Sequence, residues 1–222
     1  MSRRKVARAG WNVFVSELVR ARRRHWRFEY DGTTYPYFVH RHTWYNERTV
    51  ELALASRLLR QHFGQPVLEL GNVTRQFGLT GAQHLVVDKY ENAAGVERVD
   101  IVEFESPATF SLVLSLSTIE HVGFDEDVMD PDKPIVAADV LRRCVAPGGD
   151  LLVTFPLSYN QSFDARVRAG DFTDITQLRY LKRISGDNRW EEVGVDEVAG
   201  VRYGTPFPKA NGIAVWHWRS PI

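Results

Sequence analysis

The alternation of short apolar runs with helical segments after Pro66 most strongly constrains what this chain can fold into. Apolar runs of strand length lie at residues 67–71, 84–88, 98–102, 110–116 and 150–155. A helical segment at 135–144 leads through the turn residues 147–149 (Pro-Gly-Gly) into the last of these runs. Near-continuous apolar strands separated by helices are typical of a parallel sheet that is covered on both faces. The pattern predicts a doubly wound, mostly parallel α/β domain.

The chain before this alternation has a different character. Residues 11–24 carry apolar side chains at helical spacing and end in several arginines, which predicts an amphipathic helix with a basic end. Residues 26–40 alternate around Asp31 and Gly32 and predict an aromatic hairpin. Residues 46–63 predict a linking helix. We therefore expect an N-terminal extension over 1–64 and an α/β domain over 65–222; the basic helix is either solvated or a contact for an anionic partner.

The end of the chain completes the predicted sheet. Residues 189–191, 198–203 and 212–218 are strand-like, and turn residues lie between the last two runs. We expect them to form a terminal hairpin.

Composition excludes several classes of protein. Lys plus Arg and Asp plus Glu balance at 28 each, so net charge gives no reason to expect a nucleic-acid partner. The single Cys144 excludes an internal disulfide, and no apolar run is long enough to cross a bilayer. No set of His, Cys, Asp or Glu has the spacing of a metal site. These features favour a cytoplasmic protein.

Topology also predicts where a ligand binds. In an open parallel sheet, ligands bind beyond the carboxyl ends of the strands. The residues at or near the ends of the predicted strands are Glu69, Gly71, Asn72, Asp88, Lys89, Asp100, residues 117–121 and residues 156–160. All of them are expected at one edge of the sheet.

The order of these residues resembles the class I S-adenosylmethionine-dependent methyltransferases. The resemblance covers about residues 65–157 and rests on four segments: residues 67–71 (Val-Leu-Glu-Leu-Gly), the acid Asp88, residues 112–122 ending in Ser-Thr-Ile-Glu-His-Val, and residues 141–156 around Pro-Gly-Gly-Asp. It implies a Rossmann-like open sheet with a reversed last strand. It also implies S-adenosyl-L-methionine as cofactor, lying across the first two strand ends.

The resemblance implies a set of cofactor contacts. Asp88 would bind the ribose diol, and the alternative to this role is a solvated acid that caps the next segment. Asp100 and Ile101 would lie near the adenine, or in a turn. The other implied cofactor residues are Glu69, Gly71, Asn72, Lys89, Ser117 and Thr118.

The glycine loop departs from the family pattern. Where Gly-x-Gly-x-Gly is usual, this chain has Gly71, Asn72 and Val73, and a β-branched valine resists positive φ. In this respect the chain is similar to methyltransferase-like proteins that have Gly-Asn-Val at the same place. The loop is either a variant that binds the cofactor or part of a degenerate site on a retained fold.

Glu120 and His121 are the candidate catalytic residues. A neutral His121 imidazole can take a proton from a hydroxyl or amine nucleophile. Methyl transfer depends mainly on alignment, so His121 can instead be a structural residue at the rim, and Glu120 can simply accept hydrogen bonds from backbone amides.

Trp44, Tyr45, Tyr159 and Asn160 are the candidate substrate-binding residues, because aromatic rings with polar groups suit a sugar-like or aromatic acceptor. Any one of these rings is equally explained by packing. The sequence thus predicts a methyltransferase acting on oxygen or nitrogen of a small molecule or glycan. The alternative is a catalytically degenerate domain that binds a glycan, a partner protein or an anionic surface.

Overall fold

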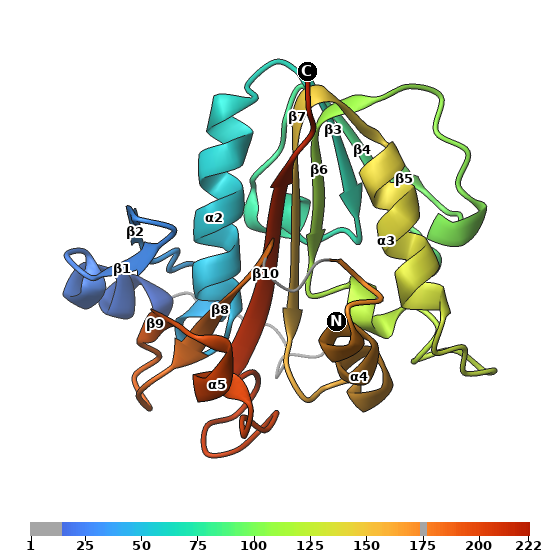
Figure 1. The fold of residues 1–222 in the computed structure, drawn as a ribbon. Helices are drawn as coiled ribbons and strands as arrows, with labels where there is room; N and C mark the ends of the chain where they lie inside the picture. The colour runs from blue at the N-terminus through green and yellow to red at the C-terminus, as the bar shows by residue number, and fades with distance from the viewer. Residues whose placement is uncertain (1–14, 174–176) are drawn as a thin grey trace, which may run out of the picture.

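The computed structural model describes residues 15–173 and 177–222 and has three layers, with helices on both faces of a central sheet (Figure 1). The sheet has eight strands in the order β5-β4-β3-β6-β7-β10-β8-β9. The strands are β3 (Pro66–Leu70), β4 (Gln83–Val87), β5 (Val96–Glu97), β6 (Phe110–Leu116), β7 (Val145–Pro156), β8 (Leu178–Arg183), β9 (Trp190–Val193) and β10 (Gly212–Arg219). The predicted α/β class is confirmed.

The sheet is parallel in its first part and antiparallel in its second. The pairs β5-β4, β4-β3, β3-β6 and β6-β7 are all parallel. The last strand, β10, runs antiparallel to both of its neighbours, β7 and β8, and β9 is antiparallel to β8. The reversed last strand is therefore confirmed as well.

Helices cover the two faces of this sheet because its strands are apolar on both sides. On one face α2 (Arg48–Gln61) packs with Leu112 and Leu114 of β6. On the other face α3 (Lys133–Arg143) and α4 (Gln161–Ala169) pack with Val113, which points the opposite way from its neighbours along the strand. Figure 1 shows α2 on one side of the strands and α3 and α4 on the other.

The short helices lie in the connections between strands. The 3-10 turns are η1 (Thr43–Tyr45), η2 (Thr74–Phe77), η3 (Ile101–Glu103) and η4 (Ile119–His121), and α5 (Val195–Val198) is a single turn. No helix among the described residues is long and apolar enough to span a membrane.

The N-terminal hairpin forms as predicted. β1 (Arg27–Tyr30) and β2 (Thr33–Pro36) pair through a turn in which Asp31 and Gly32 have φ of 49° and 65°. Both values suit the tight turn that Asp-Gly favours. Residues 15–23 are helical, while residues 11–14 of the predicted helix lie outside the described residues. The predicted linking helix is α2.

Two strand predictions are wrong. Residues 98–102 were expected as a strand, but β5 is only Val96–Glu97 and η3 begins at Ile101. The reason is local, because the Asp100 side chain accepts a hydrogen bond from the Val102 amide and caps η3. Residues 198–203 are not a strand of a terminal hairpin either; β8 pairs with β10 instead.

Candidate functional site

A buried carboxylate, that of Glu69, accepts hydrogen bonds from the glycine loop that follows β3. Glu69 is fully buried and accepts hydrogen bonds from the backbone amides of Val73 and Thr74, at 3.0 and 2.7 Å, and from the Thr74 hydroxyl. His84 Nε2 lies 3.1 Å from Glu69 Oε2, the oxygen that accepts the hydrogen bond from the Thr74 hydroxyl. Glu69 therefore fixes the turn of the loop and does not line the cavity described below.

Gly71 is required by both its conformation and its surroundings. Its φ is +82°, and a Cβ atom at this position would lie 2.5 Å from Thr118 Oγ1. The close neighbour of Gly71 is thus the segment that follows β6. Val73 packs with the cluster beneath α2, so its β-branched side chain does not enter the cavity.

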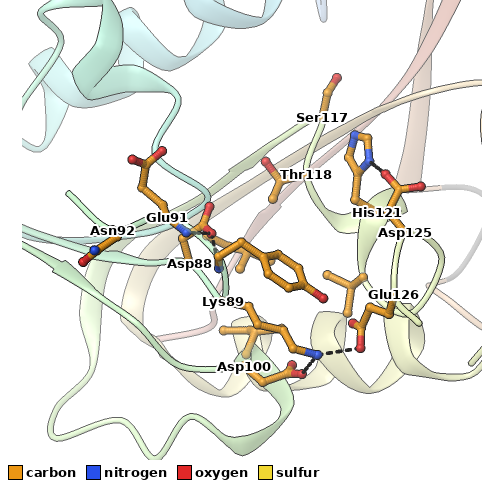
Figure 2. Close-up of a pocket in the computed structure, with 14 residues that line it drawn as sticks. Asp88, Lys89, Glu91, Asn92, Asp100, Ser117, Thr118, His121, Asp125 and Glu126 are labelled. Carbon is orange, nitrogen blue, oxygen red and sulfur yellow. Dashed lines mark hydrogen bonds and ion pairs between the residues drawn. The ribbon is translucent and has the colours of Figure 1, made fainter. Parts of the chain in front are cut away.

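The first cavity, of about 600 Å³, lies at the carboxyl ends of β3, β4 and β6 (Figure 2). Residues after β4 form one side, and residues after β6 form the other. The lining includes Leu70, Asp88, Lys89, Tyr90, Glu91, Asn92, Asp100, Ile101, Ser117, Thr118, His121, Val122, Asp125 and Glu126. Six of the predicted cofactor residues are thereby brought together: Asp88, Lys89, Asp100, Ile101, Ser117 and Thr118.

Asp88 turns the chain at the end of β4 with only one of its carboxylate oxygens. Its Oδ1 accepts hydrogen bonds from the backbone amides of Tyr90 and Glu91, both at 2.8 Å. Oδ2 has no hydrogen-bond partner among the described residues, and the side chain lines the cavity. The cap and the ligand roles considered for Asp88 are therefore compatible, because each uses a different oxygen.

A compact group of ion pairs closes one end of the cavity. Lys89 Nζ lies 2.9 Å from Asp100 and 2.5 Å from Glu126, and Lys133 Nζ contacts the same two carboxylates. The hydrogen bonds that Lys89 donates to Glu126 and Asp100 raise the pKa of Lys89. Two lysines and two acids balance in charge, so this end of the cavity is polar and neutral.

Ser117 joins the end of β6 to α2. Its φ is +37°, an uncommon value for a residue with a side chain. Its hydroxyl donates to Glu51 Oε1 at 2.5 Å, and Thr154 Oγ1 donates to the same oxygen at 2.7 Å. Arg48 donates to Glu51 Oε2 and to the Leu116 carbonyl. The first turns of α2 thus set the backbone at the strand end.

His121 is oriented by an acid one turn further along the chain. Its Nδ1 lies 2.5 Å from Asp125 Oδ2, which also accepts a hydrogen bond from the Tyr159 hydroxyl at 3.2 Å (Figure 2 shows the His121 contact). The Tyr159 ring packs against the imidazole at 4.7 Å between centroids. Burial and the neighbouring Asp125 raise the pKa of Tyr159 to about 12. With Nδ1 engaged, Nε2 is the imidazole nitrogen left for another group.

A second cavity, of about 580 Å³, adjoins the first, and Ser117 and His121 line both. The second cavity is otherwise lined by His42, Tyr45, Asn46, Glu47, Arg48, Glu120, Pro156, Tyr159, Tyr203 and Lys209. The first cavity and the second cavity therefore share a wall built from the residues that follow β6.

Glu120 is the most unusual side chain of the second cavity. It is 1% exposed, and neither carboxyl oxygen has a hydrogen-bond partner among the described residues. His121 Nε2 lies 3.6 Å from Oε1, beyond hydrogen-bonding distance. Burial raises the pKa of Glu120 well above its ordinary value. The interpretation that Glu120 binds backbone amides is therefore wrong.

The candidate substrate residues divide into two groups. Tyr45 and Tyr159 line the second cavity. Trp44 and Asn160 line neither cavity. Asn160 is buried, caps α4 through the Phe163 amide, and donates to the Glu120 carbonyl.

Sequence reasoning missed the polar residues that α2 brings to the site. Glu47, Arg48 and Glu51 lie at the start of α2, next to the carboxyl ends of β6 and β7. Their signal in the sequence was three charged residues opening a helix that is otherwise largely apolar. Tyr203, Asp125 and Glu126 carry no such signal.

The insertion of β10, antiparallel, between β7 and β8 decides the fold, because it is the reversed last strand of an otherwise doubly wound sheet. The chain has the class I methyltransferase fold.

No protein-family model matches the sequence, and no curated protein matches it. Among the described residues, no group of three or more His, Cys, Asp or Glu is arranged to hold a metal ion.

Several solved methyltransferase structures are similar to this chain at low sequence identity. The N-methyltransferase NodS from Bradyrhizobium japonicum WM9, in complex with S-adenosyl-L-homocysteine, is 14% identical, with a TM-score of 0.49 over 79% of this chain and 88% of that one. The 1,6-didemethyltoxoflavin-N1-methyltransferase of Burkholderia thailandensis is 16% identical, with a TM-score of 0.42 over 78% and 79%. A putative rRNA-methylase from Clostridium thermocellum is 12% identical, with a TM-score of 0.45 over 76% and 97%.

Proposed function

We propose that this chain is an S-adenosylmethionine-dependent methyltransferase that methylates oxygen or nitrogen of a small molecule or glycan. The observation that supports this function is the pair of cavities that share Ser117 and His121 at the carboxyl ends of the parallel strands. In this arrangement the first cavity holds the cofactor, the second holds the acceptor, and the shared wall is where they meet.

The residues of the first cavity fit the cofactor. The free Oδ2 of Asp88 accepts hydrogen bonds from the ribose hydroxyls, and the buried Ile101 supplies an apolar surface for the adenine. Asn72, a predicted cofactor residue, does not line this cavity; its Oδ1 is buried without a hydrogen-bond partner among the described residues. A volume of about 600 Å³ is in the range of small-molecule sites.

The remaining predicted cofactor residues have supporting roles. Because Gly71 has no side chain, Thr118 can approach the loop closely. Glu69 fixes the loop by accepting a hydrogen bond from the Thr74 amide. Lys89 and Asp100 are occupied with each other and with Glu126, so they close the cavity rather than bind a charged group.

Bound S-adenosylmethionine supplies an electrophilic methyl group, and the protein's task is alignment and exclusion of water. The hydrogen bond from Ser117 to Glu51 holds the shared wall in place. His121, with Nδ1 engaged by Asp125, presents Nε2 as a proton acceptor for the acceptor's nucleophilic group.

The test of this function is calorimetric titration with S-adenosylmethionine and S-adenosylhomocysteine. We expect both to bind, and Asp88→Asn to weaken binding by about tenfold, because the amide keeps the cap at Oδ1 but loses the charged acceptor. Asp139→Asn, an exposed substitution on α3, is the control and leaves affinity unchanged. If neither ligand produces heat at millimolar concentration, the result would favour the alternative that the chain is a non-catalytic binding domain.

A further inference from the structure

The second cavity contains a carboxyl group for which the protein supplies no partner. Glu120 lies on η4, and Asn160 holds its backbone carbonyl in place. Both side-chain oxygens are buried without a hydrogen bond among the described residues. An unpaired buried acceptor is destabilising, so a ligand that supplies hydrogen-bond donors would satisfy this carboxyl group.

We propose that the second cavity receives the amino group of a primary or secondary amine, and that Glu120 is the carboxylate that binds it. This inference rests on the proposed function, because it names the chemical class of the methyl acceptor. It assigns to Glu120 a substrate contact in place of the backbone contact expected from sequence.

The number of donors favours an amine over an alcohol. An ammonium group has two or three N–H donors and no acceptor, whereas a hydroxyl has a single donor. Only the ammonium group can donate hydrogen bonds to both Glu120 oxygens at once. An alcohol would leave one oxygen of the buried carboxyl without a partner, and that loss is the basis of strong discrimination at polar sites.

The walls of the second cavity also suit a cation. Tyr45, Tyr159 and Tyr203 line it, and the rings of Tyr159 and Tyr203 pack edge to face at 5.1 Å. Tyrosine rings attract cations through their electron-rich faces. The Tyr159 hydroxyl is turned to Asp125, which leaves its ring as the contact surface.

The charged groups around Glu120 set its protonation in the empty cavity. From α2, Arg48 favours the ionised form, while Glu51 and Glu47 oppose it, and Arg48 is already paired with Glu51. His121 lies beside Glu120. The side chains of Tyr159 and Tyr203 face Glu120 from the loops. His42 and the exposed Lys209 also line the second cavity. Because burial is the largest effect, the pKa of Glu120 is raised in the empty cavity.

A bound alkylammonium reverses that balance. Its positive charge favours the carboxylate, so the pKa of Glu120 falls on binding, and the carboxylate and the ammonium form an ion pair in the cavity. The ammonium must next give up one N–H proton before its lone pair is free, and His121 Nε2, which lines the same cavity, takes that proton. Binding is therefore coupled to proton release over the pH range between the Glu120 pKa values of the bound and the empty cavity.

Proton release is measured by titration calorimetry at pH 7 in phosphate and in MOPS, whose ionisation enthalpies differ and neither of which is a primary or secondary amine. The probes are 2-phenylethylamine and glucosamine, each paired with its neutral counterpart, 2-phenylethanol or glucose. We expect the neutral compounds to bind at least tenfold more weakly than the amines, and proton release to accompany amine binding wherever the pH lies below the Glu120 pKa of the empty cavity.

Glu120→Gln keeps the shape of the side chain and removes its charge, and thermal unfolding checks that the variant folds. We expect this variant to lose the proton release and about tenfold in amine affinity. Glu105→Gln makes the same chemical change in an exposed loop before β6, at the opposite end of the strand, and should behave as wild type.

Titration with S-adenosylhomocysteine separates the two proposals, because Glu120 does not line the first cavity. If the nucleoside binds but neither amine does, or if the alcohols bind as tightly as the amines, the amine assignment is overturned and the proposed function stands. If the nucleoside itself does not bind, the proposed function fails.

Discussion

The hydroxyl of Ser117 donates a hydrogen bond to Glu51 Oε1 at 2.5 Å, and this contact ties the end of β6 to the first turns of α2. Glu51 is fully buried, and it also accepts hydrogen bonds from Thr154 and Arg48. One carboxylate therefore connects a helix with two neighbouring strands, at the point where the two cavities share their wall.

Glu51→Gln should destabilise the protein by about 3 kcal/mol, because it leaves the Arg48 guanidinium without its buried counter-ion. Urea unfolding measures the change. Glu29→Gln, which weakens an exposed hydrogen bond from Thr34 on the hairpin, is the control and should cost less than about 0.5 kcal/mol. Equal stability of the two variants would show that Glu51 does not hold the strand ends together.

Gly71→Ala should cost about 2–4 kcal/mol in unfolding free energy, because it combines a left-handed backbone with a clash against Thr118. Gly170→Ala is a matched control: its φ is +84°, and a Cβ atom there meets nothing within 4 Å. The control should lose only the backbone contribution, about 1 kcal/mol. A loss at Gly71 no greater than at Gly170 would contradict the close approach of Thr118.

Asp150 makes stability depend on acid pH. Burial alone would raise its pKa, but hydrogen bonds from His217 and His62 outweigh burial and lower the pKa below its ordinary value. A carboxyl with a lowered pKa adds stability above its unfolded pKa, about 3.9, and that stability is lost as pH falls through the folded pKa.

The difference in urea midpoint between the wild type and Asp150→Asn should therefore be largest above pH of about 5 and should shrink below about pH 4. Unfolding curves over this range measure it. A difference that stays constant down to pH 3 would mean that the two histidines do not stabilise the ionised carboxyl.

Local patterns in the sequence were sufficient for the fold and for one side of the site. Apolar runs located β3, β4 and β6, and the residues just after them, such as Asp88 and Ser117, do line one cavity. Strand ends are predictable because parallel topology alone brings them to one edge. The strand expected at 98–102 failed because a side-chain cap at Asp100 competes with strand pairing.

The second cavity was not predictable, because it depends on how α2 packs. Glu47 and Glu51 are one turn apart on the helix, but the sequence does not say that this face meets the ends of β6 and β7. Tyr203 arrives from the distant connection before β10. The absence of a partner for Glu120 is a property of the packed structure and has no counterpart in the sequence.

A crystal structure of the protein with S-adenosylhomocysteine tests the central claim most directly. The account predicts the ribose hydroxyls within about 3 Å of Asp88 Oδ2, the adenine against Ile101, and the sulfur directed toward Ser117 and His121. A nucleoside bound elsewhere, or a first cavity without ligand in crystals soaked at millimolar concentration, would contradict it.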